Sequence, residues 1–468
     1  MSDTLKFGTS GLRGLATELI GAATRRYTAA FLAHLKSRGQ AGSGRVFIGR
    51  DFRASSPTIL ADCAAAIRSA GYVPVDCGTL PTPALALHAM AEGGPAIMIT
   101  GSHIPADRNG LKFYSPTGEI TKEDELGILA ALDEIGPTEG SGVAEDGYPA
   151  AGDRYRRRYK GLLAADALAG WRIGVFEHSS VARDILASLL YRAGAEVIRL
   201  GRADAFVAVD TEATSDAIYQ PRQQWIAQHR LDAIVSTDGD GDRPLLIDGK
   251  GNFVRGDVLG LLTAKFVGAQ TVVTPVTSNS AIESVGYFGK VERTKVGSPY
   301  VIEGMENQPA PVVGFEANGG TLLGTDVVVG NRMISRLPTR DAVLPILAVI
   351  GSAAAAKQSL ADFIAPLPVR PALSDRLTEV PTERTKALVE RLVGEPAFAT
   401  SYFAGIGDIE SVSTIDGPRF VLKSGDVIHY RPSGNAPELR CYVEGGTAER
   451  AALLLRWGLD AAAKVVRS

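Results

Sequence analysis

Apolar runs and amphipathic stretches alternate along the chain in a pattern that occurs twice. The two copies are RVFIGRDFRASSPTILADCAAAIRSAGYVPVDCG at residues 45–78 and WRIGVFEHSSVARDILASLLYRAGAEVIRLG at residues 171–201. Each contains an apolar run, a pair of serines, an amphipathic stretch, an Ala-Gly pair and a second apolar run. Glycine directly after a helix is a common stop signal. Strand, crossover helix and strand in this order predict a βαβ unit with parallel strands.

A third, shorter copy is TVVTPVTSNSAIESVGYFGKVERTKVG at residues 271–297, with Gly286 in the stop position. The last quarter of the chain has a different pattern. PRFVLKSGDVIHY at residues 418–430 predicts a hairpin around Ser424-Gly425, and ELRCYVE at residues 438–444 predicts another strand. Residues 447–466 form an amphipathic pattern that predicts a helix with Thr447 as its N-cap.

These patterns predict an α/β protein with three consecutive α/β modules containing mixed sheets, followed by an α+β domain. The polar stretch GPTEGSGVAEDGYPAAGD at residues 136–153 predicts the first domain boundary. The predicted domains cover residues 1–148, 149–250, 251–365 and 366–468.

Composition narrows the class of protein. The chain has 468 residues, of which 45% are hydrophobic, and a net charge of -3, so nothing global indicates nucleic acid or an anionic membrane as a partner. The N-terminus has no apolar signal-peptide core, and no apolar run reaches the ~20 residues of a bilayer span. Cys63, Cys77 and Cys441 are scattered and odd in number, which is typical of reduced thiols. We therefore expect a cytoplasmic protein.

The most informative motif is STDGDGDRPLL at residues 236–246, directly after the apolar run LDAIVS. Asp238, Asp240 and Asp242 alternate with glycines at the carboxyl end of a predicted strand, where ligands of open α/β sheets bind. Three carboxylates so close together repel one another unless a cation binds, and all-oxygen ligands suit Mg²⁺. An EF-hand loop is excluded because Arg243 and Gly249 stand where it needs Gly and Glu. Arg243 is a candidate for binding a phosphate oxygen.

Ser102 lies in AIMITGSHIPADRNGLKFY, residues 96–114, just after a second buried-looking strand. No GxSxG motif surrounds it, which excludes the α/β-hydrolase elbow. A serine can carry a transferred group if charge is neutralised nearby, and a cation at the aspartates would do this for a phosphoryl group. His103 and Lys112 are close to it in sequence. Taken alone, Ser102 also fits an ordinary turn.

Three further segments are rich in groups that bind anions or hydroxyls. KFGTSGLRG at residues 6–14 ends near Arg13 and predicts a loop that binds an oxyanion. RPSGNAPELR at residues 431–440 offers Arg431, Ser433, Gly434 and Asn435 as a phosphate cradle. GFEANGG at residues 314–320 offers Glu316 and Asn318 to sugar hydroxyls. No Walker A or strand-linked GxGxxG motif is present, so a nucleotide cofactor is not indicated.

Together and in this order, the five motifs resemble those of the α-D-phosphohexomutase family, which includes phosphomannomutases, phosphoglucomutases and phosphoglucosamine mutases. The resemblance implies four domains around a central cleft. It implies that Ser102 is a phosphoserine and that Asp238, Asp240 and Asp242, with an oxygen on Ser102, bind one Mg²⁺ per active site. Arg13, His103 and Lys112 would surround the phosphoryl group, with Lys112 as a candidate general acid or base.

Lys295, in TKVGS, matches a family lysine near the sugar, and Glu316 and Asn318 would bind hydroxyls. The cradle from Arg431 to Asn435 would hold the phosphate that does not react. The implied reaction interconverts hexose 1-phosphate and hexose 6-phosphate through a hexose 1,6-bisphosphate, which also acts as activator. We expect a sugar phosphate as the small-molecule partner, and a monomer or homodimer.

The chain departs from the family pattern at several positions. Gly101 and Ile104 replace Ala and Asn of the usual Ala-Ser-His-Asn-Pro. Phe315, Asn318 and Gly320 replace Gly, Ser and His of the usual Gly-Glu-x-Ser-Gly-His. Asn435 and Ala436 replace Thr and Glu of the usual Ser-Gly-Thr-Glu-Pro. These differences affect hydroxyl recognition more than phosphoryl transfer.

The sugar loop favours mannose phosphates as substrates, with glucose phosphates or glucosamine phosphates as alternatives. A metal-dependent phosphatase with a serine nucleophile is a remote alternative, because it would not need the cradle at residues 431–435. A non-catalytic sugar-phosphate-binding protein would not need both Ser102 and the aspartates.

Overall fold

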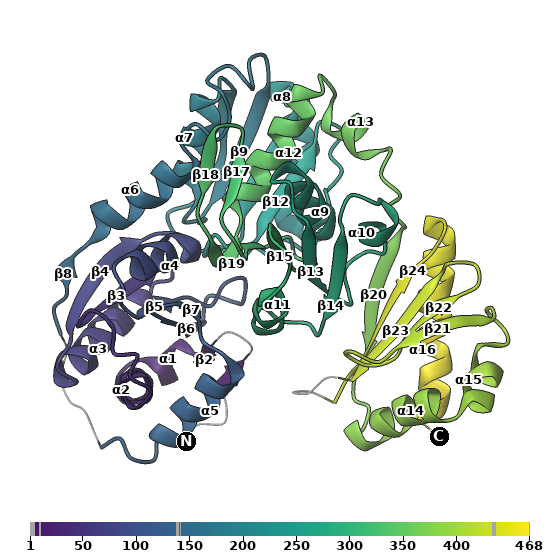
Figure 1. Ribbon diagram of the computed structural model, residues 1–468, viewed down its shortest axis with the longest axis horizontal. Coiled ribbons are helices and arrows are strands. Elements are labelled where there is room, and N and C mark those ends of the chain that lie inside the picture. The colour runs from purple at the N-terminus through teal and green to yellow at the C-terminus, as the bar shows by residue number, and fades with distance from the viewer. Residues whose placement is uncertain (1–4, 9–10, 137–139, 141, 433–436, 468) are drawn as a thin grey trace. The chain divides into compact units, whose positions relative to one another are not determined.

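The computed structural model describes residues 5–8, 11–136, 140, 142–432 and 437–467. The chain forms two compact units (Figure 1). Unit 1 combines residues 1–272 with residues 297–366, and unit 2 combines residues 273–296 with residues 367–468.

Unit 1 begins with an eight-stranded mixed sheet of order β1-β2-β6-β5-β3-β4-β8, with β7 paired to β6. The strands are β1 (Lys6–Gly8), β2 (Gly11–Leu15), β3 (Arg45–Arg50), β4 (Val73–Thr79), β5 (Ala96–Ile99), β6 (Arg108–Ser115), β7 (Gly118–Glu119) and β8 (Glu145–Asp146). Strand β3 pairs in parallel with β4 and β5, whereas β5 and β6 pair antiparallel. This pairing makes the sheet mixed, as predicted.

The helices of this first module are α1 (Ala16–Leu19), α2 (Ala22–Ser37), α3 (Ser56–Ser69), α4 (Thr82–Ala91), α5 (Lys122–Ala131) and α6 (Tyr148–Tyr159). Helix α2 packs against α3 and α5, and α4 packs against α6 (Figure 1). Phe31 of α2 and Phe113 of β6 pack against each other in the core as tilted rings with centroids 4.8 Å apart. Helix α3 also packs on β3, β4 and β5, so the helices cover the central strands.

The second sheet has the order β10-β9-β11-β12. Its strands are β9 (Arg172–His178), β10 (Glu196–Arg202), β11 (Ala233–Thr237) and β12 (Pro244–Asp248), joined by helices α7 (Arg183–Arg192) and α8 (Arg222–His229) and the short helix η1 (Ala217–Tyr219). Strand β9 pairs in parallel with β10 and β11, and β11 turns back antiparallel into β12. The β11–β12 turn carries the three aspartates.

The rest of unit 1 contains α9 (Gly256–Phe266), α11 (Ser298–Met305), β15 (Val312–Phe315), β16 (Thr321–Leu323), β17 (Val327–Val329), β18 (Arg332–Ile334), β19 (Leu337–Asp341), α12 (Val343–Ala355) and α13 (Leu360–Ile364). Strand β16 pairs antiparallel with both β15 and β19. The loop from β15 to β16 is the predicted sugar loop, and β19 lies beside it.

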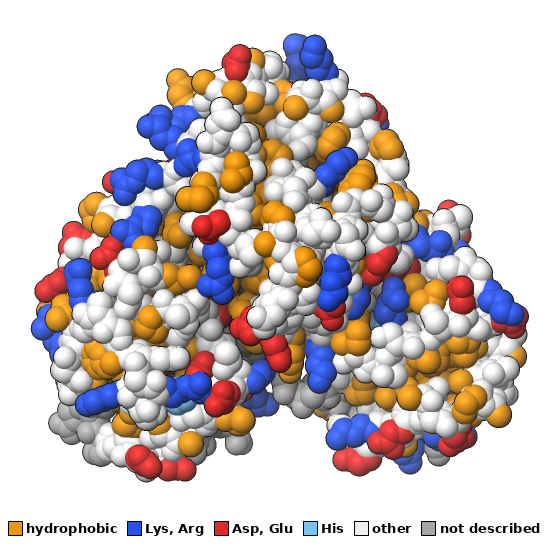
Figure 2. Space-filling model, in the orientation of Figure 1, with side chains coloured by type: hydrophobic (Ala, Val, Ile, Leu, Met, Phe, Trp, Pro, Cys, Tyr) orange, Lys and Arg blue, Asp and Glu red, His pale blue; other side chains and the backbone are white. Residues whose placement is uncertain are grey.

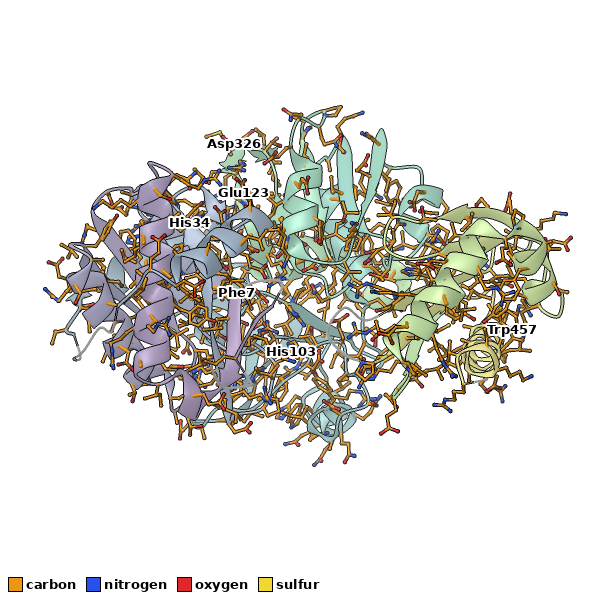
Figure 3. All side chains as sticks on the ribbon, turned by 90° about the horizontal axis from the view of Figure 1, so that it is seen from below. Phe7, His34, His103, Glu123, Asp326 and Trp457 are labelled. Carbon is orange, nitrogen blue, oxygen red and sulfur yellow. The ribbon has the colours of Figure 1, made fainter. Side chains whose placement is uncertain are left out.

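Unit 2 contains β14 (Lys290–Thr294), α10 (Ala281–Ser284) and most of β13 (Thr271–Pro275), together with an antiparallel sheet of order β20-β24-β23-β22-β21. The sheet strands are β20 (Ala372–Leu377), β21 (Ile409–Ser413), β22 (Arg419–Leu422), β23 (Val427–Pro432) and β24 (Leu439–Glu444). Helices α14 (Thr382–Gly394), α15 (Pro396–Phe403) and α16 (Ala448–Val466) complete it. Trp457 of α16 (labelled in Figure 3) packs on Phe403, with ring centroids 5.4 Å apart.

Both predicted βαβ units are confirmed, as are the β22–β23 hairpin and helix α16. The side chain of Thr447 caps α16 by accepting the backbone N–H of Arg450. In the third copy the helix is shorter than predicted, because α10 has only four residues. The N-terminal segment also differs: β1 and β2 form an antiparallel hairpin instead of a loop, because β2 pairs with β6. Thr9 and Ser10 lie outside the described residues.

Acidic and basic side chains are interspersed on the face shown in Figure 2, with hydrophobic side chains between them. This distribution agrees with the small net charge of -3. Among the described residues, no helix is both long enough and apolar enough to cross a membrane.

Candidate active site

Ser102 lies on the loop that follows the fully buried strand β5. Its backbone is left-handed, with φ of 54°, which is uncommon for a residue other than glycine. The conformation is held by its N–H, which donates to Thr100 Oγ1 at 2.8 Å, and the Thr100 hydroxyl donates to Asp51 Oδ2 at 2.8 Å. The side chain of Ser102 is therefore fixed in direction, and only 1% of the residue is exposed.

Arg53 anchors the same loop, although the sequence analysis did not identify it. Its guanidinium pairs with Asp51 and stacks over the ring of Phe206 at 3.8 Å. It also donates, over 2.6–3.1 Å, to four loop carbonyls, those of Ser102, Ile104, Pro105 and Arg108. A Cβ atom on Gly101 would lie 2.7 Å from this guanidinium. Glycine in place of the usual alanine at position 101 thus makes room for Arg53.

The three aspartates are gathered by the tight turn between β11 and β12. Asp238 Oδ1 accepts the backbone N–H groups of Asp242 and Arg243, each at 3.2 Å. Gly241 has φ of 74°, a conformation that glycine adopts without steric cost. One oxygen from each carboxylate lies within 4.8 Å of the others, and all three residues are buried.

The serine and the lysine both contact this cluster. Ser102 Oγ donates to Asp238 Oδ2 at 2.6 Å and lies 3.3 Å from Nδ1 of His103, labelled in Figure 3. Lys112 Nζ lies 2.6 Å from Asp240 Oδ2 and 2.8 Å from Asp242 Oδ2. The structure thus brings together residues that the sequence places far apart: a buried hydroxyl and an ammonium group both contact one cluster of three carboxylates.

Burial and mutual repulsion shape the charges of the cluster. Burial, followed by the charges of Asp240 and Asp242, raises the pKa of Asp238 well above its ordinary value. Burial also disfavours ionisation of Asp242, but Arg340, Lys112 and Arg243 outweigh it and lower the pKa of this carboxyl. Burial opposes the charge of Lys112, yet Asp240 and Asp242 outweigh it and raise its pKa. Asp238 is therefore the carboxyl of the cluster that is hardest to ionise, whereas Asp242 stays ionised and Lys112 stays protonated.

Two carboxylate oxygens of the cluster lack hydrogen-bond partners among the described residues. Asp240 Oδ1 and Asp242 Oδ1 are buried and accept no hydrogen bond from any described residue. Buried polar atoms are normally satisfied, so such orphans indicate a missing ligand. The hydroxyl of Thr82, which the sequence analysis did not identify, donates to the other Asp240 oxygen at 2.6 Å and orients it. The oxygen-only donor set fits a hard divalent cation.

Arg13, His103 and Arg243 extend the site. Arg13 lies on β2 opposite Gly110 of β6, and burial, followed by Arg243 and Arg340, lowers its pKa. Burial, followed by the charges of Arg243 and Arg13, lowers the pKa of His103 to about 4. Arg243 Nη1 lies 3.7 Å from Glu212 Oε2. The charges of Arg13 and Arg243 therefore act on His103, which is 3.3 Å from Ser102 Oγ, and positive charge here suits a phosphoryl group.

The sugar loop contacts the aspartate cluster through Arg340 of β19, which the sequence analysis also missed. Arg340 Nη1 donates to Glu316 Oε2 at 2.8 Å, and Arg340 Nη2 donates to Asp242 Oδ2 at 2.9 Å. Asn318 Oδ1 accepts the backbone N–H of Gly320 at 3.0 Å and so shapes the loop. Glu316 and Asn318 thus belong to the same network as the aspartates.

Lys295 and the predicted phosphate cradle belong to unit 2. Arg431 lies on β23, and its Nε is 2.7 Å from Asp416 Oδ2. Ser433, Gly434 and Asn435 lie outside the described residues. The geometry of the cradle therefore stays a prediction, as does the place of Lys295 relative to the serine.

Three domain profiles match the chain. Residues 4–139 match phosphoglucomutase/phosphomannomutase alpha/beta/alpha domain I, residues 255–369 match alpha/beta/alpha domain III, and residues 377–456 match the C-terminal domain.

Two proteins named phosphomannomutase match along nearly their whole length. One, from Sinorhizobium fredii, is 48% identical over 97% of this chain and 98% of its own. The other, from Salmonella muenchen, is 42% identical over 96% of this chain and 93% of its own. The crystal structure of a phosphoglucomutase/phosphomannomutase family protein from Burkholderia thailandensis superposes with a TM-score of 0.79 at 20% identity, covering 98% of this chain and 97% of that one. With the serine, the aspartate turn and the sugar loop in one unit, these similarities show that the chain belongs to the phosphoglucomutase/phosphomannomutase family of α-D-phosphohexomutases.

Proposed function

We propose that the protein is a phosphomannomutase, an isomerase that interconverts mannose 1-phosphate and mannose 6-phosphate. The observation that carries the proposal is the 2.6 Å contact between Ser102 Oγ and Asp238 Oδ2, within a buried cluster of three carboxylates. It is supported by the two phosphomannomutases that are 48% and 42% identical to the chain.

The proposed cofactor is one Mg²⁺, bound by Asp238, Asp240, Asp242 and an oxygen on Ser102. The orphaned oxygens of Asp240 and Asp242 support this assignment. Bound Mg²⁺ would neutralise charge on the phosphoryl group during transfer. Without bound Mg²⁺, the ammonium group of Lys112 compensates part of the negative charge of Asp240 and Asp242.

In the proposed reaction, phospho-Ser102 transfers its phosphoryl group to the free hydroxyl of a hexose monophosphate. The O–P bond to the serine breaks, an O–P bond to the sugar forms, and the product is a hexose 1,6-bisphosphate. The bisphosphate turns over within the site and returns its other phosphoryl group to Ser102, which releases the isomeric monophosphate. Free hexose 1,6-bisphosphate acts as activator because it can transfer a phosphoryl group to an unphosphorylated Ser102.

Arg13, His103 and Lys112 would surround the phosphoryl group during this transfer, with Arg13 and Lys112 as cations and His103 as a neutral side chain. Lys112 is a candidate to exchange a proton with the sugar hydroxyl. Arg243 is a candidate for binding a phosphate oxygen. In unit 2, Lys295 and the cradle from Arg431 through Ser433 and Gly434 to Asn435 would hold the distal phosphate. Glu316 and Asn318 would bind ring hydroxyls.

We expect a cytoplasmic enzyme that works as a monomer or homodimer. The three cysteines are buried and free, which suits a reducing compartment. Burial raises the pKa of the Cys63 thiol to about 12, so this cysteine is not poised to react.

The test compares kcat/KM on mannose 1-phosphate and on glucose 1-phosphate, with Mg²⁺ and a trace of the matching 1,6-bisphosphate. Discrimination through one hydrogen-bonded hydroxyl is about ten- to two-hundredfold. A preference of that size for mannose is expected. Comparable rates would mean a dual-specificity mutase, and no turnover of either substrate would contradict the proposal. Rapid release of inorganic phosphate without isomerisation would favour the phosphatase alternative.

A further inference from the structure

Arg340 connects two parts of the site that are distant in sequence. It lies on β19 with 5% of its surface exposed. Its Nη1 donates to Glu316 Oε2 at 2.8 Å, while Nε and Nη2 donate to Asp242 Oδ2 at 3.1 and 2.9 Å. One planar guanidinium therefore holds the sugar-loop carboxylate at a fixed distance from an aspartate of the cluster. A lysine ammonium could not reproduce this fork.

Gly320 provides the space for this arginine. A Cβ atom at position 320 would lie 2.7 Å from Arg340 Cδ, 2.8 Å from Arg340 Cγ and 2.9 Å from the carbonyl oxygen of Asp242. Real Cβ atoms do not approach so closely, because interiors are already close-packed. The stem of Arg340 therefore occupies the volume that any side chain at position 320 would need.

The contact between Arg340 and Glu316 uses only one of the two carboxylate oxygens of Glu316. Arg340 Nη1 and, at 3.5 Å, Asn318 Nδ2 both donate to the same oxygen, Oε2. Glu316 Oε1 makes no hydrogen bond to any described residue. A carboxylate fixed on one oxygen can accept sugar hydroxyls with the other without losing side-chain freedom on binding.

We infer that Arg340 is a positioning residue for sugar recognition: it fixes Glu316 so that Oε1 faces vicinal hydroxyls of the hexose ring. The inference rests on the proposed function. It assigns to Arg340 an effect that passes through Glu316, so the two side chains must act as one unit.

Local charge agrees with this arrangement. Burial opposes the charge of Arg340, but Asp242 and Glu316 outweigh it and raise its pKa well above the ordinary value. Arg340 therefore stays cationic across the working pH range. The carboxylates lose a buried counter-ion when it is replaced, which can also destabilise the fold, so the test must separate positioning from folding.

The test is a double-mutant cycle with Arg340→Lys, Glu316→Gln and the combined variant, measured as kcat/KM on mannose 1-phosphate and glucose 1-phosphate. We expect each single change to lower kcat/KM by about 10- to 100-fold, mainly through KM, and the double variant to be no worse than Glu316→Gln alone. Arg336→Lys, on an exposed arginine four positions earlier, is the matched control and should change neither value.

The inference would be overturned if the losses in the two single variants were additive in the double variant. It would also be overturned if kcat fell together with thermal stability while KM stayed unchanged, because Arg340 would then have only a structural role. If Arg340→Lys does not fold, Arg340→Gln replaces it in the same cycle, because its amide can still donate to one carboxylate. A wild-type enzyme without mutase activity on either sugar would instead contradict the proposed function, so the two failures are distinguishable.

Discussion

Lys112 is the residue on which the charge balance of the site depends. Its ammonium contacts Asp240 and Asp242 and is 5% exposed at the side chain. Without it, Asp240 would lose its ion-pair partner, and Asp242 would keep its pair with Arg340. Breaking a buried ion pair from one side costs about 3–5 kcal/mol.

We therefore expect Lys112→Met to lower the melting temperature markedly in EDTA. Mg²⁺ should restore more stability to this variant than to the wild type, because the cation compensates the same carboxylates. Thermal unfolding with EDTA and with Mg²⁺ measures both effects, with Lys122→Met at an exposed position as the control. An unchanged melting temperature in EDTA would show that Lys112 does not balance the aspartates.

The sequence was sufficient to predict Ser102 and the three aspartates as site residues, because each follows a recognisable buried strand. It did not reach Arg53, Thr82 or Arg340. Apart from the Arg53–Asp51 pair, these residues act through contacts with segments distant in the chain: Arg53 and Thr82 over 49 or more positions, and Arg340 over 24 positions to Glu316 and 98 to Asp242. Arg340 stands in LPTRD, between Thr339 and Asp341, where no local pattern marks it as a site residue.

The loop after β5 is the element that holds Ser102 in its conformation. Arg53 donates to four of its carbonyls, and Ser102 keeps a left-handed backbone within it. Such a conformation costs about 1–3 kcal/mol and persists only where the surroundings enforce it. The loop should therefore relax when the guanidinium is removed.

We expect Arg53→Met to reduce kcat/KM by about 100-fold and to make residues 101–108 more accessible to amide hydrogen exchange. Arg45→Met, which removes a half-exposed surface pair with Glu145, should leave both unchanged. Full activity with an exchange-protected loop would contradict the anchoring role.

The elements that sequence predicted correctly are those in which local signals agree with tertiary packing. The β3–α3–β4 and β9–α7–β10 units have clear periodicity and Ala-Gly stops. The β1–β2 hairpin lacks this signal, because its two strands are short and three of their eight residues are glycine. Its strand conformation comes from pairing of β2 with β6, for example Leu12 with Leu111, which no local pattern reveals.

Across the whole molecule, buried neutral histidines set the response to acid. His178 in unit 1 and His429 in unit 2 are each 1% exposed, and their Nε2 atoms lie 2.9 and 2.8 Å from backbone carbonyls. Burial lowers the pKa of each to about 4 from an ordinary 6.5. Because the folded state resists protonation, their contribution is complete above pH 6.5 and is lost as the pH falls toward 4.

We expect each histidine to remove about 1.4 kcal/mol of stability per pH unit within that window. In His178→Gln, the decline of stability between pH 6.5 and pH 4 should be shallower than in the wild type. Denaturant unfolding at a series of pH values measures the slope, and His229→Gln serves as the control. Parallel slopes in the variant and the wild type would rule out His178 as a source of acid sensitivity.

The central claim for the whole molecule is that Ser102 carries the phosphoryl group between the two positions of the hexose. The most direct measurement incubates the enzyme and Ser102→Ala with mannose 1,6-bisphosphate and Mg²⁺, maps phosphorylation by mass spectrometry, and then follows isomerisation of mannose 1-phosphate. The account predicts a phosphate on Ser102 that chases into hexose phosphate, and neither label nor isomerisation in the alanine variant. Near-normal isomerisation by Ser102→Ala, or a stable phosphate on another residue, would contradict it.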